Sequence, residues 1–282
     1  MHTSNTLLPE PTFVDIDGVA VATYILEPSR ACLGDIVFCH GTPWSSIVWA
    51  PVARQLSSHF RIHLWDMPGY GLSSKGRSIA YDLRSQMRRF TAVLRHWNLE
   101  SPHVIAHDIG GAVALGSHVL ELTDFAGVFL WDIVTLDPWG SPFFRLVAEN
   151  EEVFAGLPPE LHDALVREYI AGAALKSLDA YWITALAEPW NDVRGQAAFY
   201  QQIAALDPKD THEVAEKLHT VRCRVRIGWG REDPWIPSSQ AAELQARLPG
   251  HPSTVMLAGT GHLAPLEKTV EVREAIDEWL NL

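Results

Sequence analysis

Short apolar runs alternate with helical patterns along the first half of the chain. Residues 13–16 and 19–26 flank the turn Asp17-Gly18 and predict a hairpin. Residues 35–40 (DIVFCH) are almost continuously apolar, as expected of a strand buried on both faces. Further strands are expected at 61–65, 103–106 and 127–134, and helices at 48–57, 81–97 and 110–120. The alternation predicts an α/β fold, with a mostly parallel central sheet and helices on both faces.

The pattern changes after Leu136. Residues 136–220 show no clear core strand and are helix-like, rich in large aromatic residues and punctuated by prolines. Strands are again expected at 225–229 and 253–257, and a helix at 270–280. We therefore expect a core domain of residues 1–135 and 221–282 with an inserted helical lid, 136–220. A separate helical subdomain is the alternative, but both ends of the segment join strand edges of one sheet.

Composition and charge exclude several classes of protein. The 282 residues are 47% apolar and 20% charged, which suits a globular protein with a large core. The net charge is −12, and Lys and Arg are scattered, so a nucleic-acid groove is not expected. An apolar lid can also pack against a partner subunit, so a homodimer is one possible assembly.

The cysteines and the N-terminal sequence bear on location. The three cysteines are widely spaced without a Cys-x-x-Cys pair, which predicts free thiols in a reducing compartment. Residues 1–11 lack a basic segment followed by an apolar one, so no signal peptide is expected. No stretch approaches the roughly 18 apolar residues of a membrane span. These features predict a cytoplasmic protein with no membrane contact.

The segment from His103 to Gly111 (HVIAHDIGG) carries the most informative motif. A predicted strand runs into a turn centred on Asp108, and a predicted helix follows. Ala106 and Gly110 are small, as a strained strand-to-helix turn requires on either side of its central residue. Such a turn lifts the central side chain to the carboxyl edge of the sheet, where open α/β sheets bind ligands. Taken alone, Asp108 could equally be a helix N-cap.

Other motifs also follow predicted strands. They are HGTPW (40–44), DMPGYGLS (66–73), GREDPWIP (230–237) and GTGHL (259–263). Each has a simpler reading alone: His40-Gly41 could be a strand-end turn, and His262 a surface histidine. We assign the glycine- and proline-rich 66–73 loop to turn formation and no chemistry. Together, Asp108, Asp233 and His262 follow the order nucleophile, acid, histidine.

These five motifs resemble those of the α/β-hydrolase superfamily across nearly the whole chain. The His-Asp-x-Gly turn further resembles the aspartate-nucleophile branch, which includes epoxide hydrolases and dehalogenases and carries a helical lid after the sixth strand. The resemblance implies that Asp108 attacks an sp³ carbon to form an ester. An aspartate carboxylate is ionised at neutral pH and needs no activating base. His262 would then activate the water that hydrolyses the ester.

The resemblance also implies the supporting residues. Asp233 would orient His262, with Asp132, at the end of a predicted strand, as the alternative acid. The backbone N–H groups of Thr42 and Ile109 would form the oxyanion hole. His107 is interpreted as structural. The side chains expected to contact substrate are His40, Trp44, Trp139, Trp182 and Tyr200.

The leaving group is the open question. Haloalkane dehalogenases place a tryptophan after the nucleophile, where this chain has Ile109, although tryptophans of the lid could substitute. An epoxide hydrolase needs an acid, usually a lid tyrosine, and Tyr200 lies where the family has its second such tyrosine; a lid-core aromatic is the alternative. Tyr169, Tyr181 and His162 are the possibilities for the first acid.

We therefore expect an epoxide hydrolase-like enzyme that acts with water on a small or medium apolar molecule and needs no metal or organic cofactor. The runner-up is a haloalkane dehalogenase-like hydrolase. A biosynthetic lyase or cyclase and a non-catalytic ligand receptor on the same fold are further alternatives.

Overall fold

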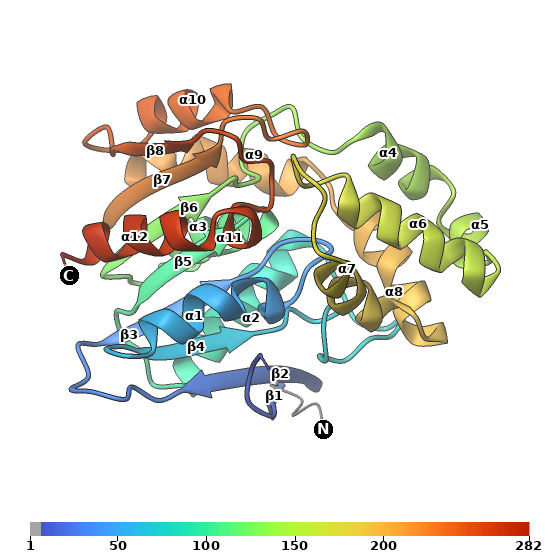
Figure 1. Cartoon of the computed structure of the whole chain (residues 1–282), viewed down its shortest axis with the longest axis horizontal. Coiled ribbons are helices and arrows are strands. Elements are labelled where there is room, and N and C mark those ends of the chain that lie inside the picture. The colour runs from blue at the N-terminus through green and yellow to red at the C-terminus, as the bar shows by residue number, and fades with distance from the viewer. Residues whose placement is uncertain (1–6, 282) are drawn as a thin grey trace.

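One sheet of eight strands organises the computed structural model, which describes residues 7–281 (Figure 1). The strands lie in the order β1-β2-β4-β3-β5-β6-β7-β8. Their bounds are β1 Thr12–Ile16, β2 Val19–Leu26, β3 Asp35–Cys39, β4 Arg61–Trp65, β5 His103–His107, β6 Gly127–Trp131, β7 Arg224–Gly230 and β8 Thr254–Leu257. β1 and β2 form the expected hairpin, and β2 is antiparallel to β4. All pairs from β4 through β8 are parallel.

The central strands are apolar because both faces of the sheet are covered. Every residue of β6 (GVFLW) is buried, and so are the last four residues of β3 and β5. The helices α1 (Ala50–Leu56), α11 (Ala264–Glu267) and α12 (Thr269–Leu280) pack together on one face. The helices α2 (Leu83–His96) and α3 (Ile109–Val119) pack together on the other. The predicted α/β architecture is confirmed.

The long connection between β6 and β7 is helical. Its helices are α4 Pro142–Glu149, α5 Glu151–Ala155, α6 Pro159–Ala171, α7 Ala180–Ala187, α8 Val193–Ala204 and α9 Lys209–Glu216. α9 packs against α2 and α3 of the core, whereas α4 to α8 form a group beside the carboxyl ends of the parallel strands (Figure 1). All six lie within the range 136–220 in which the lid is predicted. We call this range the insertion.

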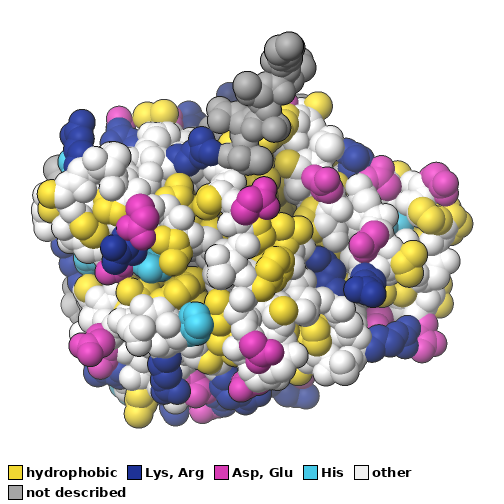
Figure 2. Space-filling model, turned by 90° about the horizontal axis from the view of Figure 1, so that it is seen from below, with side chains coloured by type: hydrophobic (Ala, Val, Ile, Leu, Met, Phe, Trp, Pro, Cys, Tyr) yellow, Lys and Arg dark blue, Asp and Glu magenta, His cyan; other side chains and the backbone are white. Residues whose placement is uncertain are grey.

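The remaining core helix, α10 (Ser239–Arg247), packs beside β7 and β8. None of the helices in residues 7–281 combines the length and apolar character needed to cross a membrane. Acidic and basic side chains are interspersed over the face shown in Figure 2. The prediction that residues 1–11 hold no signal peptide falls largely on residues 1–6, which lie outside the described residues.

Candidate active site

A sharp turn between β5 and α3 presents Asp108. Its backbone has φ 54° and ψ −130°, a conformation that costs a non-glycine residue on the order of 1–3 kcal/mol. Two glycines allow this geometry. A Cβ on Gly41 would lie 2.3 Å from Cβ of Asp108, and one on Gly110 would lie 2.4 Å from the carbonyl oxygen of His40. The turn therefore holds the backbone of Asp108 in a strained conformation, and the two glycines leave the room that this conformation needs.

The carboxylate of Asp108 is held from two sides. The backbone N–H of Thr42 donates to Oδ1 at 2.6 Å. Oδ2 lies 3.3 Å from Nε2 of His262, and this nitrogen makes no hydrogen bond to any other described residue. The residue is only 3% exposed. One oxygen is therefore fixed by a backbone donor, and the other faces an imidazole.

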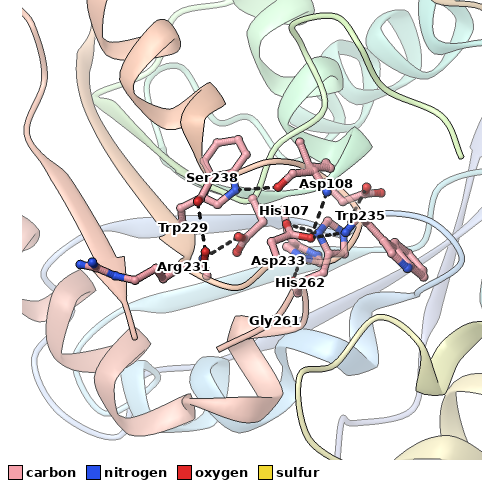
Figure 3. A network of polar contacts seen from close by, with 12 residues as sticks. His107, Asp108, Trp229, Arg231, Asp233, Trp235, Ser238, Gly261 and His262 are labelled. Carbon is pink, nitrogen blue, oxygen red and sulfur yellow. Dashed lines mark hydrogen bonds and ion pairs between the residues drawn. The ribbon is translucent and has the colours of Figure 1, made fainter. Parts of the chain in front are cut away.

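Asp233 orients the His262 ring from the opposite side (Figure 3). Nδ1 of His262 donates to Oδ2 of Asp233 at 2.8 Å, so the free nitrogen is the one that faces Asp108. The second oxygen of Asp233 accepts the backbone N–H groups of Trp235 and Ile236 at 2.7 and 3.0 Å. Both oxygens of the Asp233 carboxylate therefore have fixed donors.

The loop that carries Asp233 is closed by its own hydrogen bonds (Figure 3). The hydroxyl of Ser238 donates to the carbonyl of Arg231 at 3.1 Å, and Nε1 of Trp229 donates to the carbonyl of Ile236 at 3.2 Å. These bonds cross the loop between the end of β7 and the start of α10. The position of Asp233 is therefore fixed by the hydrogen bonds of its own loop as well as by its bond to His262.

The two aspartates determine the charge of His262. Burial alone would lower the pKa of His262, but the charges of Asp233 and Asp108 and hydrogen bonding to them raise it well above its usual value. The neighbouring His107 behaves differently, because burial lowers its pKa to about 4. His107 Nε2 donates to the carbonyl of His262 at 2.8 Å, so its neutral ring supports the backbone of His262.

Asp132, the alternative acid, lies at the end of β6 and is fully buried. Its Oδ1 accepts the backbone N–H of Gly230 at 2.6 Å, and its Oδ2 has no partner among the described residues. Burial and the charge of Asp233 raise the pKa of Asp132 well above its usual value. The structure therefore pairs His262 with Asp233, whereas the hydrogen bond that Asp132 makes goes to the backbone of Gly230.

A cavity opens beside Asp108. The residues that line it are Thr42, Asp108, Ile109, Val134, Trp139, Gly140, Ser141, Phe144, Tyr169, Trp235 and Ile236. They come from the core and from the insertion. The only charged side chain among them is that of Asp108, so the cavity favours a neutral and largely apolar molecule.

Comparison with known proteins identifies the family. A model of the alpha/beta hydrolase family matches residues 36–275. The chain belongs to the α/β-hydrolase family. The structure of an alpha/beta hydrolase fold protein from Burkholderia ambifaria is 33% identical, superposes with a TM-score of 0.90, and is matched over 95% of this chain and 97% of that one.

Curated relatives of this α/β hydrolase differ in activity. A pimeloyl-(acyl-carrier protein) methyl ester esterase from Shewanella sp. (strain MR-7) is 27% identical over 271 residues, which are 87% of this chain and 90% of the relative. A haloalkane dehalogenase from Agrobacterium fabrum (strain C58) is 39% identical over 80 residues, which are 28% of this chain and 26% of the relative. The family is therefore shared, whereas the reactions of its members are not.

The residues predicted to form the oxyanion hole both lie at the cavity of this α/β hydrolase. Thr42 donates to Asp108, as described, and Ile109 begins α3 directly after Asp108. Trp139 also lines the cavity, but its Nε1 donates to the hydroxyl of Thr211 at 2.9 Å. The indole of Trp139 therefore offers substrate its ring face or edge carbons, and its N–H is already used.

The other predicted substrate contacts lie outside the cavity lining. Nδ1 of His40 donates to the carbonyl of Gly41 at 2.8 Å and Nε2 accepts the N–H of Met67 at 2.9 Å, so this ring braces the loop. The indole of Trp44 stacks on that of Trp235, with ring centroids 5.7 Å apart. Trp182 packs edge-on against Tyr181 on α7. His40 and Trp44 therefore support residues around the cavity.

Tyr200 is bound inside the insertion. Nε2 of His162 lies 2.9 Å from the carbonyl of Trp190, which can only accept, so Nδ1 of His162 accepts the Tyr200 hydroxyl at 2.8 Å. The hydroxyl proton of Tyr200 is therefore already donated. Neither residue lines the cavity next to Asp108.

Tyr169 is the tyrosine that lines the same cavity as Asp108. Its ring stacks on that of Trp235 at 4.7 Å. Burial, followed by the charge of Asp108, raises the pKa of Tyr169 well above its usual value, so the phenol keeps its proton. Trp235 lies in the motif at 230–237, and the sequence alone predicts no role for it; its position two residues after Asp233 is the signal that could have found it.

Proposed function

We propose that Asp108 is the nucleophile of a two-step hydrolysis through an ester intermediate. The proposal rests on the different partners of the two carboxylate oxygens of Asp108. The Thr42 N–H donates to Oδ1 at 2.6 Å, while Oδ2 lies 3.3 Å from Nε2 of His262. Oδ2 attacks an sp³ carbon of the substrate, the bond from that carbon to the leaving atom breaks, and an alkyl ester forms on Asp108. The residues that line the cavity include no Lys, Arg or His, so a substrate in the cavity reaches Asp108 without meeting a cationic side chain of the lining.

The first step prepares His262 for the second. Esterification removes the negative charge of Asp108, which is one of the two charges that raise the pKa of His262. The imidazolium then releases its proton to solvent water more readily, and the neutral ring accepts a proton from the attacking water through Nε2. That water attacks Cγ of Asp108, Oδ1 becomes an oxyanion, and the Thr42 N–H stabilises it by about 3–4 kcal/mol. Collapse of the intermediate releases the alcohol, which takes its proton from His262, and the carboxylic acid left on Asp108 ionises by returning a proton to the ring.

We further propose that the substrate is a neutral, largely apolar epoxide. Ring opening breaks a carbon–oxygen bond and leaves an alkoxide that needs a proton, and the Tyr169 phenol faces the same cavity as Asp108. Tyr169 supplies that proton as the ester forms, its phenolate recovers a proton from solvent water, and the second step gives a diol. A high pKa keeps the phenol protonated through the ordinary pH range.

A haloalkane is the second candidate, supported by the partial similarity to the Agrobacterium dehalogenase. A leaving halide needs N–H donors, and Trp235 lines the cavity with an indole that could supply one. The Trp139 N–H is already donated to Thr211, which leaves this cavity with fewer donors than the halide requires.

A single turnover in water enriched in oxygen-18 tests the proposal. Enzyme in excess over an epoxide such as styrene oxide is quenched after one turnover, and the diol and the peptide that contains Asp108 are weighed. Because water attacks Cγ, the label should enter the Asp108 carboxylate and be absent from the first diol. Label in the diol with none in Asp108 would mean that water attacks the substrate directly and would overturn the ester mechanism.

A further inference from the structure

Two buried hydrogen bonds tie the Thr42-Pro43 segment to the insertion. The Thr42 hydroxyl donates to Oε1 of Gln202 on α8 at 2.9 Å. Nε1 of Trp190 donates to the carbonyl of Pro43 at 3.0 Å. Thr42 is the residue whose backbone N–H holds Asp108, so helices of the insertion reach the donor of the reacting carboxylate.

The side chain of Gln202 has no freedom in this arrangement. It is fully buried, and its Oε1 also accepts the hydroxyl of Tyr70 at 2.6 Å. Its Nε2 donates to the carbonyl of Phe199 at 3.0 Å. A carbonyl accepts only, so the amide cannot turn round without placing two oxygens against each other. Gln202 is therefore a fixed acceptor for two hydroxyls, one from each of two core loops.

We propose that Gln202 is a positioning residue that sets the direction of the Thr42 N–H toward Asp108. The side-chain bond to Gln202 and the backbone bond to Oδ1 leave from the same residue, so together they fix the orientation of its peptide. Without an acceptor at position 202, the Thr42 and Tyr70 hydroxyls lose their buried partner, and the segment must shift to satisfy them. The orientation of the Thr42 N–H that donates to Asp108 therefore depends on a residue of the insertion as well as on the core.

The consequence for catalysis rests on the proposed function. Oδ1 carries a full negative charge in the tetrahedral intermediate of ester hydrolysis, whereas charge leaves the carboxylate during alkylation. A misdirected Thr42 N–H should therefore slow hydrolysis more than alkylation. In a Gln202 variant, the ester on Asp108 should accumulate during turnover.

Amide hydrogen exchange of Thr42 tests the positioning role without any substrate. The variant is Gln202→Leu, which removes the acceptor at similar volume. The matched control is Gln196→Leu on the same helix, because Nε2 of Gln196 donates to the carbonyls of Ala155 and Leu157, both within the insertion. We expect Thr42 to exchange about tenfold faster in Gln202→Leu and within about twofold of the wild type in Gln196→Leu.

Thr42→Val tests the same positioning role from the other partner, because it removes the hydroxyl that bonds Gln202 while keeping the backbone N–H. It should also speed exchange of residue 42, even where Gln202→Leu fails to fold. Unchanged exchange at residue 42 in the folded variants, or an equal rise in Gln196→Leu, would overturn the proposal.

A kinetic measurement separates this inference from the proposed function. In pre-steady-state turnover of styrene oxide, Gln202→Leu should lower the rate of ester hydrolysis by about tenfold relative to the rate of alkylation. An ester that forms and is hydrolysed at the wild-type ratio would contradict the role of Gln202 and leave the nucleophile in place. If the wild type forms no ester on Asp108, the proposed function fails, and the exchange rates of Thr42 still decide the positioning role.

Discussion

Nε2 of His262 and Oδ2 of Asp108 lie 3.3 Å apart in a site that is almost completely closed to solvent. Asp233 bonds the other side of the ring, Asp132 lies behind Asp233, and the neutral His107 packs against the ring. The raised pKa of His262 follows from this arrangement, in which an imidazolium lies between two carboxylates. The raised pKa favours the protonated ring in the free enzyme, and the ring must lose that proton before it can act as a base.

The first prediction concerns pH. The folded-state pKa of His262 is raised, so the stability it contributes is complete below its unfolded pKa of about 6.5 and is lost as pH rises through the folded value. Asp108→Asn removes one of the two charges and should reduce this loss. Unfolding by urea at several pH values between 6 and 9 measures it. Identical pH dependence in the two proteins would contradict the coupling between the two side chains.

The second prediction separates the two possible acids. Asp233→Asn removes the carboxylate that orients His262 and should lower turnover by about 10³- to 10⁴-fold. Asp132→Asn keeps an acceptor for the Gly230 N–H and removes no bond to His262, so turnover should stay within about tenfold of the wild type. Steady-state kinetics of both variants measures the two losses of turnover. A larger loss in Asp132→Asn than in Asp233→Asn would mean that Asp132 is the acid that orients His262.

The third prediction is that Asp132→Asn makes stability less sensitive to pH. The folded-state pKa of Asp132 is raised, so ionisation above its unfolded pKa of about 3.9 favours the unfolded chain, and stability falls as pH rises toward the folded value. An asparagine cannot ionise. The variant should therefore lose less stability than the wild type between pH 4 and 7, as measured by urea unfolding. A steeper loss in the variant would show that Asp132 is charged in the folded protein.

The fourth prediction compares two tyrosines. Tyr169→Phe removes the phenol at the cavity and should slow ester formation from an epoxide by about 10²- to 10⁴-fold, with little effect on hydrolysis of an ester already formed. Tyr200→Phe removes only the bond to His162 and should cost about 1 kcal/mol of stability with turnover largely kept. Pre-steady-state kinetics and thermal unfolding measure the two effects. A larger loss of ester formation in Tyr200→Phe would reverse the assignment.

Sequence patterns predicted the core of this protein well. Apolar runs such as DIVFC and GVFLW indicated buried strands, and the Asp-Gly turn indicated the hairpin of β1 and β2. The spacing of small residues around Asp108 also predicted the sharp turn, because only small neighbours fit there. These features depend on local chemistry, which a single sequence carries directly.

The contacts of the insertion could not be predicted in the same way. Tyr169 and Tyr200 are similar aromatic residues on amphipathic helices, and only the packing of α6 and α8 decides which of them lines the cavity beside Asp108. The bond between Gln202 and Thr42 spans 160 residues, and a buried glutamine on a helix has no distinctive spacing. Such features depend on tertiary packing between segments distant in sequence.

Trapping the ester on Asp108 tests the central claim most directly. The His262→Gln variant is incubated with a panel of epoxides and bromoalkanes, and intact mass and peptide mapping then locate any adduct. Since glutamine cannot take the proton from water, the ester should form on the peptide that contains Asp108 and persist, and its mass should correspond to an epoxide. An adduct from bromoalkanes alone would favour the dehalogenase. No adduct on Asp108, although the wild type turns over the same compounds, would contradict the account.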